Sequence, residues 1–258
     1  MSSPPNFLPF YKFIGHLFNW GLYGVLTVQV YLYYISFPKD NYKLKTVVAS
    51  AYILDTIQLT LATYDGFRIY GSGWGDAKQL DTMSLQWVSL PVLGGLVGAL
   101  YQIFYAWRIY ALGQNRWLAC IILLISMVVI GSGIYEGAAC ARLLLMSEAP
   151  RRTYKPTIAW IGCAALGEAI ITGSMFYYLH KARRSSRVKQ TTNLLTRLIA
   201  LTIETGLISA TVDVTGLALF IALPDAAYYE PLAIVASKLF SIRVFILPVG
   251  EMLQKWTS

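Results

Sequence analysis

Long apolar stretches dominate the pattern of hydrophobic and polar positions along this chain. Seven stretches are each long enough to cross about 30 Å of hydrocarbon at 1.5 Å per residue. They occupy residues 16–37, 46–67, 85–108, 117–140, 157–180, 195–222 and 231–253. The strands of a membrane barrel are shorter and alternate over about ten residues. We therefore expect an all-α, polytopic membrane protein built as a seven-transmembrane-helix bundle.

Basic charge differs between the loops that join the expected helices, and this predicts the orientation. The first, third and fifth loops carry eleven Lys and Arg residues, whereas the second, fourth and sixth carry six. The positive-inside rule places the odd-numbered loops in the cytoplasm, with the N-terminus outside and the C-terminus cytoplasmic. We expect an extracellular N-terminal segment over 1–15, a transmembrane domain over 16–253 and a cytoplasmic tail over 254–258. The sequence does not specify which membrane holds this multi-pass protein.

Composition supports the membrane class and narrows the chemistry. Of the 258 residues, 56% are hydrophobic and 13% are charged, against about 25% charged in soluble domains. The net charge of +8 lies mostly in loops, so we expect membrane lipids as partners and no nucleic acid. Cys120, Cys140 and Cys163 lack the spacing of metal ligands. Because no metal, nucleotide or cofactor motif is present, we expect neither a metal nor a cofactor.

Ionisable side chains interrupt five of the seven apolar segments, and they are the strongest pointer to function in the sequence. They are Asp55, Glu136, Glu168, Glu204, Asp213, Lys238 and Arg243. A charge at the bilayer centre costs roughly 2.5–3.5 kcal/mol on insertion scales. A chain whose only task was to span a membrane would not need this set.

Counting residues along the expected helices gives each charge a depth. Asp213 and Lys238 share a depth on adjacent helices, so we predict a structural ion pair between them. Glu204 and Asp213 are nine residues apart, which points them to nearly opposite faces of one helix. The remaining inner acids, with polar neighbours and a nearby arginine, predict a polar, acidic ligand cavity. Its expected members are Asp55, Gln58, Gln102, Glu168, Glu204 and Arg243.

Several segments resemble a known family. The longest is YYLHKARRSSRVKQTTNLLTRLIALTIETGLISATVD at 177–213, and the others are SKLFS at 237–241, YGVLTVQVYLYYISFPKD at 23–40 and YQIFYAWRIYAL at 101–112. They are similar to an uncharacterised seven-span membrane protein family of mushroom-forming fungi, known only as a domain of unknown function. The positions that match the family pattern are Arg197, Glu204, Thr205 and Lys238, and Asp55 and Glu168 fall where the family tends to have an acid. Glu136 and residues 242–251 depart from it, and the resemblance implies no activity.

Three functions remain open. Seven spans with an external N-terminus favour a receptor-like or sensor-like protein for a small apolar ligand, whose basic loop at 181–197 could meet a cytoplasmic partner. The second function is an intramembrane enzyme of secondary metabolism, such as a terpenoid or meroterpenoid cyclase, in which a buried acid protonates an apolar substrate. Its candidate acids are Asp55, Glu136, Glu168 and Glu204. The third is a transporter, although no internal repeat is evident.

Overall fold

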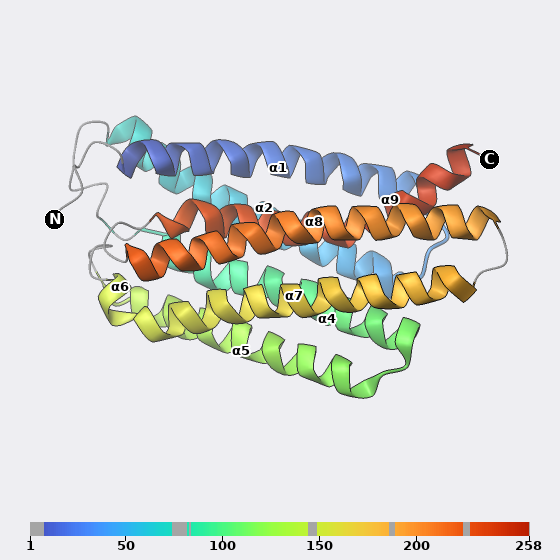
Figure 1. The fold of residues 1–258 in the computed structure, drawn as a ribbon. Coiled ribbons are helices and arrows are strands. Elements are labelled where there is room, and N and C mark those ends of the chain that lie inside the picture. Colours follow the sequence, from blue (N-terminus) through green and yellow to red (C-terminus); the bar gives the residue numbers. More distant parts are fainter. Residues whose placement is uncertain are drawn as a thin grey trace.

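The computed structural model describes residues 8–73, 82, 84–143, 149–185, 189–223 and 228–257, and over these residues the chain is all-helical (Figure 1). Seven long helices account for most of the described residues. They are α1 (Leu8–Ser36), α2 (Tyr42–Phe67), α4 (Gly94–Gly113), α5 (Arg116–Cys140), α7 (Tyr154–Ser185), α8 (Lys189–Ala222) and α9 (Tyr229–Thr257). Each coincides with one of the apolar stretches, so the prediction of an all-α chain is confirmed.

Three short elements complete the chain. The π-helical turn η1 (Arg68–Ser72) continues α2, the π-helical segment η2 (Val88–Leu93) leads into α4, and α6 (Ala149–Arg152) precedes α7. Pro91 lies inside η2. Proline has no N–H to donate to the preceding turn and its ring crowds that turn, so a wider π turn is a natural outcome at this position.

Two helices extend past the limits expected for the transmembrane domain. α1 begins at Leu8, within the expected extracellular segment over 1–15. α9 continues to Thr257, within the expected cytoplasmic tail over 254–258. Residues 1–7 and 258 lie outside the described part of the chain.

The long helices run lengthwise and alternate in direction, so that α1 begins at one end of the bundle and α9 finishes at the other (Figure 1). α9 lies centrally, because it packs against α1, α2, α4 and α8. α5 lies at the periphery, against α4 and α7. We call the end of the bundle where α6 lies the α6 end.

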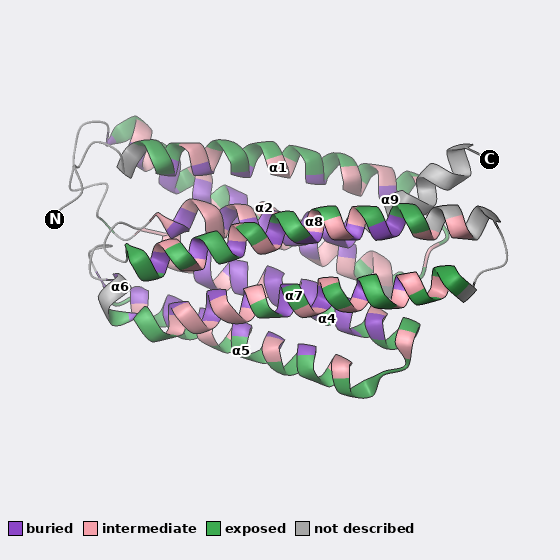
Figure 2. Cartoon of the chain, viewed as in Figure 1, coloured by how far each residue is buried: buried purple, intermediate pink, exposed green. Residues whose placement is uncertain are grey.

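Large apolar side chains lie on the outside of the bundle as well as in its core. Large apolar side chains cover the outward faces of α1, α5 and α8, where Figure 2 shows exposed residues along each helix. Examples are Phe18, Val28, Leu124, Met127, Leu207 and Val214. An extensive exposed apolar surface of this kind is typical of a membrane-facing protein. Five helices, over Leu44–Ser72, Val88–Gly113, Arg116–Cys140, Tyr154–Arg184 and Leu195–Ala222, are long and apolar enough to span a membrane, which is consistent with a multi-pass membrane protein.

Glycines allow close contact between α5 and the segment that contains η2. A Cβ atom on Gly133 would lie 2.5 Å from the carbonyl oxygen of Pro91, and one on Gly137 would collide with Val92. Two backbones approach this closely only when small residues line the contact. The GxxxG pattern of α5 therefore serves packing within the bundle.

Candidate functional site

A buried lysine of α9 forms the first polar centre of the bundle. Lys238 Nζ donates to Asp55 Oδ1 at 2.5 Å, to the Asp55 carbonyl oxygen at 3.0 Å and to Gln58 Oε1 at 3.0 Å. Ser237 Oγ donates to the same Gln58 oxygen at 2.7 Å, and Gln58 Nε2 donates to the Ser89 carbonyl oxygen at 3.0 Å. Lys238 and Asp55 are both 0% exposed. This network joins α2, η2 and α9 by interactions that water does not screen.

The prediction of an ion pair between Asp213 and Lys238 is therefore corrected: the partner of Lys238 is Asp55. The two residues do share a region of the bundle, because Asp213 lines a cavity with Ser237, the neighbour of Lys238. Depth alone could not decide the partner, because α9 contacts both α2 and α8. The partner of Lys238 depends on the side of α9 from which its side chain projects, and that side faces α2.

A buried arginine, five residues later on α9, forms the second polar centre. Arg243 makes an ion pair with Glu168 of α7, and both side chains are almost fully buried. Ser209 of α8 donates to the same Glu168 oxygen. The guanidinium donates to Ser209 Oγ at 3.4 Å and to Thr172 Oγ1 at 3.3 Å. Five residues rotate a helix by about 140° net and advance it about 7.5 Å, so Lys238 and Arg243 serve different neighbouring helices.

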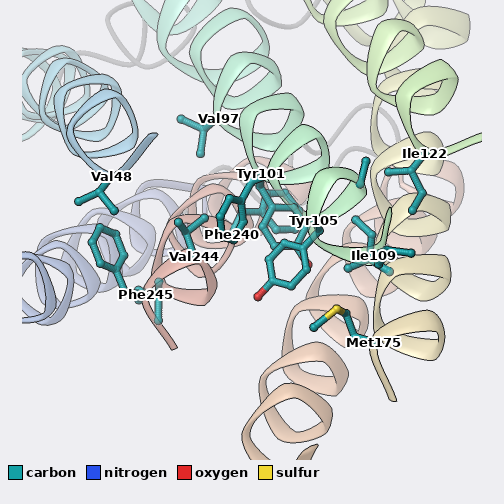
Figure 3. Packing of buried hydrophobic residues seen from close by; sticks show 14 of the residues in the cluster. Val48, Val97, Tyr101, Tyr105, Ile109, Ile122, Met175, Phe240, Val244 and Phe245 are labelled. Carbon is teal, nitrogen blue, oxygen red and sulfur yellow. The ribbon is translucent and has the colours of Figure 1, made fainter. Parts of the chain in front are cut away.

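Aromatic rings pack beside the arginine of the second centre. Tyr101 of α4 stacks on Phe240 of α9 with ring centroids 5.2 Å apart, and Tyr105 lies beside them (Figure 3). The Arg243 guanidinium carbon lies 5.3 Å from the Tyr101 ring centroid and 5.6 Å from that of Tyr105, within range of a cation–π interaction. Tyr105 also donates to the Arg243 carbonyl oxygen at 3.0 Å. The rings and the charged groups thus form one packed core.

The six residues expected to share a cavity are distributed differently. Asp55 and Gln58 belong to the first centre, and Glu168 and Arg243 belong to the second. Gln102 is buried against the bare backbone of Gly167, next to Glu168. None of the six lines either of the two cavities described below.

Glu204 is exposed on the outer surface of α8, which corrects its assignment to an interior cavity. Helix phase explains the position. The buried face of α8 contains Thr202, Ser209 and Asp213, at intervals of seven and four residues. Glu204 lies two residues, or about 200°, from Thr202 and therefore on the opposite side. The expectation that Glu204 and Asp213 point to opposite faces agrees with this arrangement.

A third buried ion pair lies at the α6 end and was not expected from the sequence. Lys12 of α1 lies 3.5 Å from Glu230 of α9, and both are nearly fully buried. Glu136 of α5 is buried within electrostatic range of Glu230, and its Oε2 has no hydrogen-bond partner. The sequence does not single out Lys12 and Glu230, because both lie at the ends of apolar stretches, where charged residues are common. Their separation in sequence gives no signal of the pairing.

The larger of the two cavities is an apolar groove on the surface between α2 and α4, which we call the α2–α4 groove. Its volume is about 690 Å³. It is lined by Leu44, Val47 and Leu54 of α2, by Leu96, Ala99, Leu100, Ile103, Phe104 and Trp107 of α4, by Ile130 of α5, and by Asp40 and Asn41 between α1 and α2. The polar residues stand at one end. There Asp40 Oδ2 accepts from the buried Tyr33 hydroxyl at 2.9 Å and Oδ1 accepts from the Asn41 N–H at 2.8 Å, which fixes the carboxylate.

A smaller cavity of about 30 Å³ lies among α4, α5, α7, α8 and α9. Its wall includes Trp160, Tyr229 and Phe240, together with the hydroxyl residue Ser237 and one carboxylate, that of Asp213. Asp213 Oδ2 is buried without a hydrogen-bond partner. The sequence predicted Asp55 in a cavity and Asp213 in an ion pair. In the structure Asp55 forms the ion pair and Asp213 lines a cavity.

Part of the chain matches a known protein family. Residues 164–247 match a family of unknown function, DUF6534. The matched stretch runs from the middle of α7 through α8 into α9. It contains the Glu168–Arg243 ion pair and Asp213, but only Ser237 and Lys238 of the Asp55–Lys238 centre. No curated protein and no solved structure matches the chain. The match agrees with the resemblance to a domain of unknown function.

The basic loop at 181–197 lies partly outside the described residues, because 186–188 are not described. Among the residues that are described, no group of three or more His, Cys, Asp or Glu side chains could hold a metal ion.

Proposed function

We propose that this chain is a receptor-like membrane protein whose seven long helices all cross the bilayer, with the N-terminus outside, and that it binds a small, mainly apolar molecule. The observation that carries the proposal is the α2–α4 groove. Its volume of about 690 Å³ falls within the range of about 300–1,000 Å³ that is usual for ligand pockets. The resemblance to seven-span proteins of mushroom-forming fungi is part of the proposal, and the match over 164–247 is to a family of unknown function.

The walls of the groove indicate the chemistry of the ligand. Apart from Asp40 and Asn41, every residue in the lining is apolar or aromatic. Ile103 and Trp107 of the lining are themselves exposed on the surface of the bundle. In a bilayer this surface faces lipid, so a ligand would enter sideways from the membrane. An amphiphile with an apolar body and one hydrogen-bond-donating or cationic group fits, because the fixed Asp40 carboxylate can accept from that group.

Binding is favoured over the enzyme alternative by the positions of the acids. An acid that protonates an apolar substrate must face a cavity that holds the substrate. Asp55 and Glu168 instead face cations, and Glu204 faces outward. Asp213 does face a cavity, but about 30 Å³ is too small for a terpenoid. Glu136, buried with an unpartnered oxygen, is the acid on which an enzyme would depend.

Quenching of Trp107 fluorescence tests the proposal. The purified protein in detergent is titrated with 9,10-dibromooctadecylamine, an amphiphile with a cationic head group for the Asp40 carboxylate and bromines that quench tryptophan on contact. A saturable component of quenching is expected from Trp107, which lines the groove. Trp117 is 83% exposed and outside the lining, so it reports the non-saturable background.

Two variants decide the source of the signal. Trp107→Phe should remove the saturable component, and Leu96→Phe with Leu100→Phe should weaken it by filling the groove. Ile121→Phe is the matched control, because it adds the same kind of bulk on the exposed face of α5. Saturable quenching that survives the first two changes would contradict binding in the α2–α4 groove.

A further inference from the structure

Three of the buried carboxyl groups have a cation as ion-pair partner, whereas Asp213 has none among the described residues. Asp55, Glu168 and Glu230 each face one cation, Lys238, Arg243 and Lys12 respectively. Asp213 is 5% exposed, and within the described part of the chain neither an ion pair nor a hydrogen bond reaches its side chain. A carboxylate left in this state is costly deep in a membrane protein. We therefore expect a bound positive charge from outside the protein chain to compensate the Asp213 carboxylate.

The space beside Asp213 has the size of a small ion with water. The cavity of about 30 Å³ accommodates about two water-sized particles, since one needs at least 10–15 Å³. Gly94, Gly98 and Gly216 line it, and their missing side chains leave the room. A larger organic cation does not fit a volume of this size.

The wall of the cavity offers a second oxygen ligand. Ser237 lines the cavity, and its hydroxyl hydrogen is used in the donation to Gln58 Oε1. Its oxygen lone pairs therefore remain free to accept or to coordinate. Trp160 and Phe240 add aromatic faces, which attract cations. Hard monovalent cations prefer such oxygen ligands, and water completes their coordination.

We propose that the cavity bounded by Asp213 and Ser237 is a binding site for a small monovalent cation of the size of Na⁺. The ion is held by the Asp213 carboxylate, by Ser237 Oγ and by water. Through Ser237 and Gln58 the site is hydrogen-bonded to the Lys238–Asp55 centre. This site is separate from the α2–α4 groove and does not depend on the function proposed for that groove.

Thermal stability in two salts tests the site. The apparent melting temperature of the purified protein in detergent is measured in NaCl and in choline chloride at equal ionic strength, because choline is too large for the cavity. A ligand that binds only the folded state stabilises it in proportion to the logarithm of one plus the ratio of ligand concentration to dissociation constant. At about ten times the dissociation constant, Na⁺ should raise the melting temperature by roughly 3–6 °C.

Asp213→Asn should abolish the difference between the two salts, whereas Glu204→Gln should keep it. Glu204 is the matched control, because it loses the same charge on the exposed face of the same helix. Direct binding of ²²Na⁺ should likewise be lost in Asp213→Asn and kept in Glu204→Gln. Equal melting temperatures in NaCl and choline chloride for the wild type would overturn the proposal, as would an unchanged difference in Asp213→Asn. A melting temperature that responds to pH alone would also overturn it, since the carboxyl group would then hold a proton.

Ala164→Leu provides a second route if Asp213→Asn fails to fold. Ala164 lines the cavity, and leucine at this position fills it without changing any charge. The difference between the two salts should disappear in this variant as well. Its persistence would show that Na⁺ acts elsewhere and would refute the site.

Discussion

Replacing Lys238 by methionine should destabilise the bundle strongly. The substitution keeps the length of the side chain and removes all three hydrogen bonds that Nζ donates, two to Asp55 and one to Gln58. Gln58 Oε1 keeps the donation from Ser237, but the Asp55 carboxylate is left at 0% exposure without a cation. This uncompensated charge, rather than the lost packing, is the dominant effect.

The magnitude follows from burial. Removing one partner of a buried ion pair costs about 3–5 kcal/mol, whereas replacing both partners by neutral groups is often close to neutral. Lys238→Met and Asp55→Asn should each cost about 3–5 kcal/mol, and the double variant should cost less than either. The resulting coupling energy is at least about 3–5 kcal/mol, at or above the upper end of the range for residues in contact.

Unfolding in mixed micelles measures this coupling. The protein is titrated from a mild detergent into sodium dodecyl sulfate while tryptophan fluorescence is followed, and the free energy of unfolding is extrapolated for each variant. The control cycle combines Lys238→Met with Asp213→Asn, and its coupling energy should be clearly smaller than that with Asp55. A larger coupling with Asp213 than with Asp55 would refute the assignment of the ion pair.

The same assay checks two further predictions. Gly133→Ala should cost about 1–3 kcal/mol, because its Cβ would meet the rigid Pro91 carbonyl oxygen at 2.5 Å; Gly131→Ala on the same helix has nothing within 4 Å and should gain up to about 1 kcal/mol. A similar loss for both glycines would contradict the close contact of α5. Glu168→Gln should cost about 3–5 kcal/mol by leaving a buried guanidinium without its anion, whereas Glu204→Gln should change the free energy of unfolding by less than about 0.5 kcal/mol. Comparable effects of the two glutamates would show that burial does not distinguish them.

The positions of the helices could be predicted from the sequence because each apolar run is long enough to form one helix by itself. The boundaries were less well determined. The first apolar stretch was placed at 16–37, whereas α1 begins at Leu8 and includes Lys12. In the structure Glu230 compensates this charge from α9, a contact between opposite ends of the chain that no local pattern reveals.

The partners of the buried charges could be predicted only in part. Helix phase correctly separates Glu204 from Asp213, because rotation per residue is a local property. The choice between Asp55 and Asp213 as the partner of Lys238 depends on which neighbour of α9 the lysine faces, and this is set by packing of the whole bundle. The α2–α4 groove was not anticipated for the same reason, since its walls are ordinary apolar residues on helices far apart in sequence.

The central claim, that seven helices cross the membrane, is tested most directly by locating the two ends of the chain. Within the part of the chain that the structure describes, five helices meet the length and hydropathy expected of a span. If the basic loops are cytoplasmic in both cases, seven crossings place the N-terminus outside and the C-terminus in the cytoplasm, and five crossings reverse both. In sealed microsomes treated with protease, an N-terminal epitope tag should therefore be protected and a C-terminal tag digested. A digested N-terminal tag with a protected C-terminal tag would contradict the seven-span bundle.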